Sequence, residues 1–343
     1  MAVGMRLLAL AGLAALVLIG AGCHPEADET APQNGASRSP AMMKALYRAQ
    51  SRARHRPRDL QAQLEAGKLS YDYGMYNDAY QAYMRAVNID AQSFDAIVGM
   101  ARTNLKLQNP TQGLDWVERA RRLKPNDREL VELEARMYLL AGKIDAAISS
   151  FRHATDIEPG NATTWLNLAS AYAVTRRYPE AVAAAKKAVA IAPSSAAAHF
   201  VLGRFAEKNG DRATAEREYR NALRLDAKHA SSMVALARIL ADDKRNLDEA
   251  RKLAVQASQV ESERAEAAIL AAWILHLQGN DEQAGNELIK VANTMPQDPD
   301  GWEKLAIVMR KLGHTEQAER AEEMAKQFLP PSRSPEMEML EGR

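Results

Sequence analysis

The feature that most constrains the fold of this chain is a repeat of 34 residues that runs through most of the sequence. Counting from Leu60, small residues return at the eighth, twentieth and twenty-seventh positions of successive units. At the eighth position they are Gly67, Ala101, Ala135, Ala169, Gly203, Ala237, Ala272 and Ala306. One extra residue near 242–247 shifts the phase once. A chain with this period is built from one supersecondary unit that stacks on copies of itself.

Each unit has the pattern of two amphipathic helices, with apolar residues at three-and-four spacing. Strong helix formers such as Ala, Leu, Glu and Arg are abundant, and aromatic residues make up only 6% of the chain. Pro110 and Pro179 lie at or near the start of second helices, where a missing N–H costs little. Glycine, which suits the left-handed residue of a helix C-cap, ends several first helices. These glycines are Gly74, Gly142, Gly210, Gly279 and Gly313.

The signature residues of these units resemble the tetratricopeptide repeat. The match is clearest in the fourth unit, at Trp165, Leu168, Ala169, Tyr172, Ala181, Ala188 and Pro193. The sixth and seventh units are weakest, because Ala254 and Leu288 replace the aromatic residue of the twenty-fourth position. The resemblance implies an all-α, right-handed solenoid over residues 58–332, whose concave face is lined mainly by first helices. Its eight expected units are 60–93, 94–127, 128–161, 162–195, 196–229, 230–264, 265–298 and 299–332.

The first 22 residues have the features of a secretory signal peptide. Their apolar run ends at Ile19 and is shorter than the ~20 residues that span a bilayer. Small residues then lead into Cys23, the only cysteine, in a pattern that resembles the bacterial lipobox except for Gly20 at a usually aliphatic place. We expect lipidation of Cys23, and His24 favours the periplasmic face of the outer membrane over the inner membrane. The alternative is a secreted protein or an uncleaved anchor.

Two segments outside the repeats are poor in apolar side chains and cannot offset the entropy of ordering. Residues 23–57 are expected to be a flexible tether, in which 41–55 have the composition of a short helix that caps the array. Residues 333–343 are expected to be a disordered tail.

The sequence contains no motif for nucleotide binding, serine hydrolysis or zinc proteolysis. Its seven histidines are scattered, without acidic or cysteine companions at metal-ligand spacing. We therefore expect no enzymatic activity, no cofactor and no metal. The formal net charge of +1 gives no indication of nucleic-acid binding. The expected partners are proteins or peptides, and contact with a membrane is expected through the lipid anchor only.

The ninth position of the first helices carries the one pattern that suggests a binding site. It is basic in five of six consecutive units, with Ser170 as the exception. The five bases are Lys68, Arg102, Arg136, Arg204 and Arg238. We expect these side chains to form a basic ladder on the concave face that binds carboxylates of an extended acidic peptide. The resemblance adds that some tetratricopeptide domains clamp a terminal carboxylate with basic residues and Asn; the full clamp pattern is absent here, but Asn167 is a further candidate contact. Trp273 is another, because it falls on the ninth position of its own unit.

The alternative for the ladder is pairing of each base with an acid three or four residues away on the same helix. Four bases have such an acid, in the pairs Arg136 with Glu132, Arg238 with Asp242, Lys68 with Asp72, and Arg204 with Glu207. Arg102 has none, and Gly99 is expected to leave open space beside it. Arg102 is therefore predicted to be the most available base of the ladder.

These features together predict a non-catalytic adaptor that is tethered to the bacterial envelope and helps to assemble an envelope complex. Such complexes include pili and secretins, polysaccharide exporters and the outer-membrane assembly machinery. The alternative is a secreted regulatory or substrate-recruiting subunit of a cell-wall enzyme or a glycosyltransferase.

Overall fold

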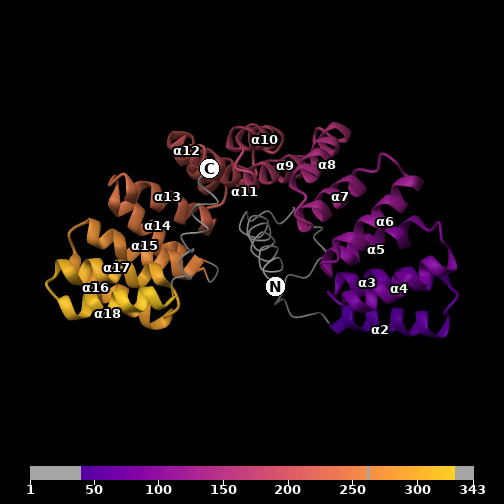
Figure 1. Cartoon of the computed structure of the whole chain (residues 1–343), viewed down its shortest axis with the longest axis horizontal. Helices are drawn as coiled ribbons and strands as arrows, with labels where there is room; N and C mark the ends of the chain where they lie inside the picture. The colour runs from indigo at the N-terminus through magenta and orange to yellow at the C-terminus, as the bar shows by residue number, and fades with distance from the viewer. Residues whose placement is uncertain (1–39, 261–262, 329–343) are drawn as a thin grey trace, which may run out of the picture. The chain divides into compact units, whose positions relative to one another are not determined.

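The computed structural model describes residues 40–260 and 263–328, and all regular structure in these ranges is helical (Figure 1). Helix α2 (Pro40–His55) precedes eight helix pairs, one for each predicted repeat. The pairs are α3 (Leu60–Asp72) and α4 (Tyr76–Ile89), α5 (Phe94–Lys106) and α6 (Pro110–Leu123), α7 (Arg128–Leu140) and α8 (Ile144–Ile157), α9 (Ala162–Val174) and α10 (Tyr178–Ile191), α11 (Ala196–Lys208) and α12 (Arg212–Leu225), α13 (Ala230–Asp242) and α14 (Leu247–Ala257), α15 (Arg264–Leu277) and α16 (Asp281–Thr294), α17 (Pro299–Lys311) and α18 (Thr315–Phe328). The predicted all-α repeat architecture is confirmed.

The chain divides into two compact units, one up to residue 209 and one from residue 210. In each unit every helix packs on the next one in sequence. Consecutive first helices also touch, in the pairs α3–α5, α5–α7, α9–α11, α13–α15 and α15–α17. No two consecutive second helices within either described unit are in comparable contact. First helices therefore lie closer together than second helices. Within each unit the stack of repeats curves so that the first helices line its concave side.

The turn inside each repeat ends the first helix with one left-handed residue. Five repeats place glycine there, for example Gly142 at φ +72°. Gln108, Arg176 and Lys244 adopt the same conformation in the second, fourth and sixth repeats, at φ 57°, 58° and 50°. The sixth repeat adds a second left-handed residue, Asn246, which accommodates the extra residue seen in its sequence. The predicted glycine caps are confirmed, and the turn geometry is the same where glycine is absent.

The connection between repeats is four residues long in most cases, as in 124–127 between Leu123 and Arg128. Its last residue caps the next helix: the Asp127 carboxylate accepts a hydrogen bond from the N–H of Leu130 at 3.2 Å. Asn161 and Ser195 cap α9 and α11 in the same way. These caps satisfy backbone donors that the first turn of a helix leaves without partners.

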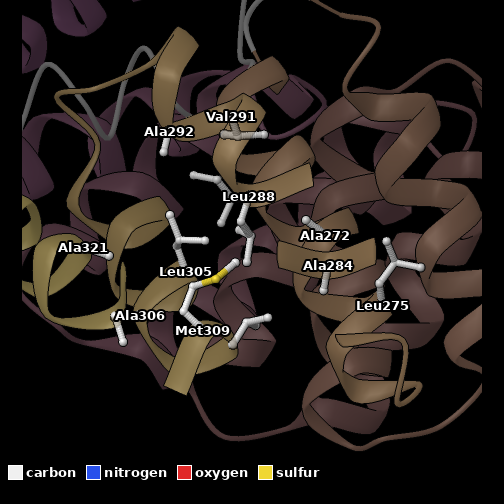
Figure 2. Close-up of a cluster of buried hydrophobic side chains, with 13 residues drawn as sticks. Ala272, Leu275, Ala284, Leu288, Val291, Ala292, Leu305, Ala306, Met309 and Ala321 are labelled. Atoms are coloured by element: carbon white, nitrogen blue, oxygen red, sulfur yellow. The ribbon is translucent and has the colours of Figure 1, made fainter. Parts of the chain in front are cut away.

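Small residues at the repeat positions are buried between helices, and large ones fill the remaining space. Phe151 and Tyr219, at the twenty-fourth position, are fully buried. The ring of Tyr83 lies against Gly99, where an added Cβ would come within 2.5 Å of the ring. The expectation of open space beside Gly99 was therefore wrong, because a side chain of the preceding repeat fills it. In the last two repeats Leu288, Leu305 and Met309 point toward one another in a continuous apolar cluster (Figure 2).

Several expectations fall on residues outside the described ranges. They are the signal peptide of residues 1–22, the lipidation site Cys23, the tether as far as residue 39, the last four residues of the eighth unit (329–332), and the tail of residues 333–343. Within the described ranges, α2 occupies the part of the predicted tether in which a short helix was expected, and it packs on α3. None of the described helices combines the length and apolar character needed to cross a membrane.

Candidate partner-binding face

The first-helix face is defined here as the surface formed in each unit by the exposed side chains of the first helices. In the unit up to residue 209, it includes Lys68, Arg102 and Arg136 on the touching helices α3, α5 and α7. All three side chains are exposed. Arg204 on α11 is half-buried, and its guanidinium lies 5.7 Å from the ring centre of Phe200. The ninth position thus places basic groups on consecutive helices, as the repeat predicted.

Arg102 is not the open base that the sequence suggested. Its Nη2 and Nε both lie 2.5 Å from Oε1 of Glu129, at the second position of the next first helix. Burial lowers the pKa of Arg102, but the hydrogen bond and the charge of Glu129 outweigh it and raise the pKa above the ordinary value. The prediction that Arg102 has no acidic partner is therefore wrong. The rule of three-and-four spacing missed an acid that is 27 residues away.

Arg238 in the second unit pairs in the same way across two repeats. Its Nη1 lies 3.1 Å from Oε1 of Glu266, again at the second position of the next first helix. Two of the four acids expected to pair within a helix have other partners, since Glu132 binds Arg128 at 2.9 Å and Asp242 binds Arg212 at 2.8 Å. The predicted pairing of Arg238 with Asp242 within one helix is therefore corrected to pairing between repeats. The predicted pairing of Arg136 with Glu132 is corrected to no ion pair among the described residues.

Arg136 has no ion-pair partner among the described residues because the second position of the next repeat is Thr163, which carries no charge. Lys106, on the last turn of α5, is close enough to Arg136 for the two positive charges to interact. Burial, and then the charge of Arg136, lower the pKa of Lys106. Lys106 likewise has no acidic partner in the described chain. The Lys106–Arg136 pair is therefore a place of uncompensated positive charge on the first-helix face.

Lys106 was missing from the residues predicted for the site. It follows Arg102 by one helical turn, so it lies on the same face of α5. Scanning two positions per first helix, instead of the ninth alone, would have found it. Lys68 on α3 also has no ion-pair partner among the described residues, so it remains a candidate contact.

The two uncharged candidates are in different environments. Asn167 is half-buried on α9, beside Ser170, whose buried hydroxyl donates to the carbonyl of Leu166 at 2.9 Å. The Trp273 ring is half-buried against the core of the last repeats, 4.6 Å from the ring of His276 and 5.8 Å from the Lys304 ammonium. Trp273 thus presents only part of its ring to a partner.

A second charged arrangement lies between α15 and α17. The Asp281 carboxylate lies 2.5 Å from Nδ1 of His276 and 2.8 Å from the ammonium of Lys311. The hydrogen bond from Lys311 holds the pKa of Asp281 below its usual range, burial opposes the shift, and the hydrogen bond with His276 adds to it. This network connects the seventh repeat to the eighth. No group of three His, Cys, Asp or Glu side chains suited to a metal ion occurs within 40–260 and 263–328.

Comparisons with known proteins agree with this architecture. Family models of the tetratricopeptide repeat match residues 138–205 and 200–259. The chain is a tetratricopeptide-repeat protein. Tetratricopeptide repeat protein 8 of Caenorhabditis elegans is 24% identical over 208 residues, which are 57% of this chain and 41% of that protein. This tetratricopeptide-repeat protein therefore spans less than half the length of that curated relative.

Solved structures of two proteins have the same fold. PilF of Pseudomonas aeruginosa matches with a TM-score of 0.53 and 18% identity, over 62% of this chain and 96% of that one. Yeast Tom70 matches with a TM-score of 0.55 and 16% identity, over 88% of this chain and 62% of that one. At these identities the likeness shows the solenoid fold alone. Such a fold serves as a scaffold for protein–protein interaction, and stacked repeats provide its extended binding surface.

Proposed function

We propose that this tetratricopeptide-repeat protein is a non-catalytic adaptor that binds an acidic segment of a partner protein on its first-helix face. The observation that carries the proposal is the Lys106–Arg136 pair. These two exposed cations lie on touching helices with no acid of residues 40–260 or 263–328 paired to them, so they repel each other, and a bound carboxylate would relieve that repulsion. The planar guanidinium of Arg136 also suits a carboxylate in a two-pronged hydrogen bond.

Because Arg102 is paired with Glu129, it is no longer the base expected to contribute most to binding a partner. A partner carboxylate at Arg102 must compete with an acid that is already in place. At Arg136 there is no such competitor in the described chain. We therefore place the centre of the binding site at Arg136, with Lys106 beside it and Lys68 as a further contact.

The proposal also places the protein in the bacterial envelope, attached through lipidated Cys23, where it helps to assemble an envelope complex. The support is the sequence of residues 1–23, with its apolar run and small residues before the cysteine. Several acyl chains give stable attachment, whereas one gives only marginal binding. A secreted regulatory or substrate-recruiting subunit is the alternative, favoured by Gly20 at a usually aliphatic place. Mass spectrometry of the mature N-terminus separates the two, because only the adaptor carries acyl chains on Cys23.

A charge exchange tests the binding site. A partner is first identified by crosslinked pulldown from envelope fractions, and its binding segment is titrated against wild type, Arg136→Glu, Arg102→Glu and Lys186→Glu. Lys186 is an exposed residue of the second helix α10 and is the control. A charge-assisted hydrogen bond contributes ~1.5–3 kcal/mol, and ~1.4 kcal/mol corresponds to one decade of affinity.

Arg136→Glu should weaken binding by at least about tenfold, and the loss should shrink at high salt because surface charges are screened. Lys186→Glu should leave the affinity unchanged. Equal losses in Arg136→Glu and Lys186→Glu would contradict the proposed location of the site. A larger loss in Arg102→Glu than in Arg136→Glu would contradict the central position of Arg136.

A further inference from the structure

Tyr83 of α4 differs from the aromatic residues that occupy the same twenty-fourth position in other repeats. Phe151 and Tyr219 are fully buried there, whereas Tyr83 keeps 8% of its surface exposed. The Tyr83 hydroxyl has no hydrogen-bond partner among the described residues. It also keeps access to solvent, unlike the unpartnered oxygens of Gln63 and Tyr73, which are closed off. Because the hydroxyl of a buried tyrosine normally has a partner, Tyr83 has a hydrogen bond to offer to a ligand.

Two glycines on first helices let the Tyr83 ring reach through the stack. A Cβ at Gly67 of α3 would lie 3.0 Å from Cζ of Tyr83, the carbon that carries the hydroxyl, and a Cβ at Gly99 of α5 would lie 2.5 Å from it. The ring of this second-helix residue therefore lies between the touching first helices α3 and α5. Gly99 is the only glycine at the sixth position of a unit. The other residues at that position are Glu65, Leu133, Asn167, Val201, Ala235, Leu270 and Lys304.

Charged groups of both signs surround the Tyr83 hydroxyl. Burial raises the pKa of Tyr83, the charge of Arg102 opposes that shift, and the charges of Asp72 and Asp95 add to it. Arg102 is itself paired with Glu129. The phenol therefore stays neutral at physiological pH, and the two acids that act on it disfavour a carboxylate as its ligand. A peptide group is uncharged and can both donate to and accept from a hydroxyl, so it suits this position.

Tyr71 of α3 connects the Tyr83 hydroxyl with the Lys106–Arg136 pair. It is close enough to Tyr83 for the two phenols to influence each other's ionisation. Burial raises the pKa of Tyr71, and the charges of Arg136 and Arg102 oppose the shift. The Tyr83 hydroxyl and the Lys106–Arg136 pair thus lie on one continuous part of the first-helix face, over the touching helices α3, α5 and α7.

We propose that the Tyr83 hydroxyl hydrogen-bonds the main chain of the partner's acidic segment while the Lys106–Arg136 pair binds its carboxylates. The inference rests on the proposed function and adds a second kind of contact to the same site. The cations select for acidic side chains, whereas the hydroxyl selects for a peptide group whatever the side chain. Gly67 and Gly99 are then needed for binding as well as for packing, because they let the ring of a second-helix residue reach the first-helix face.

Binding of two probes to the full chain tests this contact. One is a labelled oligoglutamate peptide with capped ends, and the other is a labelled oligoacrylate, which has carboxylates but no peptide groups. Tyr83→Phe should weaken oligoglutamate binding about three- to tenfold, as expected for one uncharged hydrogen bond, and by the same factor at low and high salt because no charge changes. It should leave oligoacrylate binding and the free energy of unfolding unchanged. Arg136→Glu should weaken binding of both probes at least about tenfold. Tyr80→Phe, on the same helix and against the same hydrophobic cluster, is the matched control and should change neither.

The possible failures are distinguishable. Unchanged oligoglutamate binding in Tyr83→Phe, together with a loss in Arg136→Glu, would overturn this inference and leave the proposed function standing. An equal loss of both probes in Tyr83→Phe would assign the hydroxyl to a carboxylate and overturn the main-chain contact. A loss of binding that comes with a lower free energy of unfolding in Tyr83→Phe would show a packing role instead. Oligoglutamate that does not bind wild type, or that binds Arg136→Glu equally well, would contradict the proposed function and this inference with it.

Discussion

The first three repeats and the last two use the same backbone frame to present different surfaces. The ninth position of the first helix is Lys68, Arg102 and Arg136 in the former, and Trp273 and Ile307 in the latter. Whether a base on this face is free to bind a partner depends on the residue at the second position of the next repeat. That residue is Glu129 for Arg102, which it binds, and the uncharged Thr163 for Arg136. The repeat therefore fixes where a side chain lies, whereas the neighbouring repeat decides whether its charge is available.

The cores of the two regions also differ, in how much space is left beside a buried glycine. Filling that space gives the largest expected change in the free energy of unfolding. A Cβ at Gly99 would meet the Tyr83 ring at 2.5 Å, and a Cβ at Gly285 would meet the terminal carbon of Met309 at 2.5 Å. A packed aromatic ring cannot move away cheaply, whereas the end of a methionine side chain can. Gly99→Ala should lower the free energy of unfolding by about 1–3 kcal/mol. Gly285→Ala should be neutral or stabilising by up to about 1 kcal/mol, because alanine favours the helix.

Denaturant titration of both variants measures this difference. Gly160→Ala is the control, because no atom lies within 4 Å of the Cβ position at Gly160. Equal destabilisation by Gly99→Ala and Gly285→Ala would show that the two regions tolerate crowding alike.

Removing a charged contact should change the free energy of unfolding by different amounts in the two regions, although the difference is smaller than for the glycine substitutions. The Asp281 side chain is 14% exposed and binds both His276 and Lys311, whereas the Arg102–Glu129 pair is about half exposed at 48% and 44%. Asp281→Asn should cost about 1–2 kcal/mol, since it weakens two charge-assisted hydrogen bonds. Glu129→Gln should cost less than about 1 kcal/mol, as expected for a surface ion pair.

The pH dependence of stability provides an independent check of Asp281. Its pKa is lower in the folded than in the unfolded chain, so its contribution is present above the ordinary pKa of about 4 and is lost as pH falls through the lowered value. As the pH falls from about 4 through the lowered pKa, the free energy of unfolding should therefore decrease less in Asp281→Asn than in wild type. Parallel stability curves of the two proteins between pH 5 and the acid transition would contradict the assignment.

The smallest effect concerns the turns. The second repeat holds Gln108 in the left-handed conformation at φ 57°, whereas the seventh repeat has Gly279 at φ 85°. Gln108→Gly should stabilise the protein by about 0.5–1 kcal/mol, because glycine adopts this conformation without a steric penalty. Gly279→Gln should have the opposite effect. Thermal unfolding of both variants measures the pair, and a change of the same sign in both would refute the account of the turns.

Much of the fold could be predicted from the sequence because its signals are local. Glycine at Gly142 and the cap at Asp127 mark helix ends within a few residues of each other, and small residues at fixed positions set the register of the stack. The eight helix pairs follow from these signals. The sequence also showed where the basic side chains lie on the first helices.

The availability of those side chains could not be predicted in the same way. The partner of Arg102 is on the next repeat, and the ring that fills the space at Gly99 comes from the previous repeat. Both contacts depend on how two helices far apart in sequence pack together. The rule that neighbours on a helix are three or four residues apart does not reach them. Lys106 was missed because only one position per helix was considered.

The central claim, that a partner protein binds on the first-helix face, is tested most directly by site-specific photocrosslinking in cells. A photoreactive amino acid replaces Arg102 on α5, which touches the helix of Arg136 and leaves Arg136 in place, or Lys186 on α10. Adducts are identified by mass spectrometry after irradiation. The account predicts a discrete adduct with one partner protein from position 102 and none with that partner from position 186. An adduct with the same partner from position 186 and none from position 102 would contradict the account.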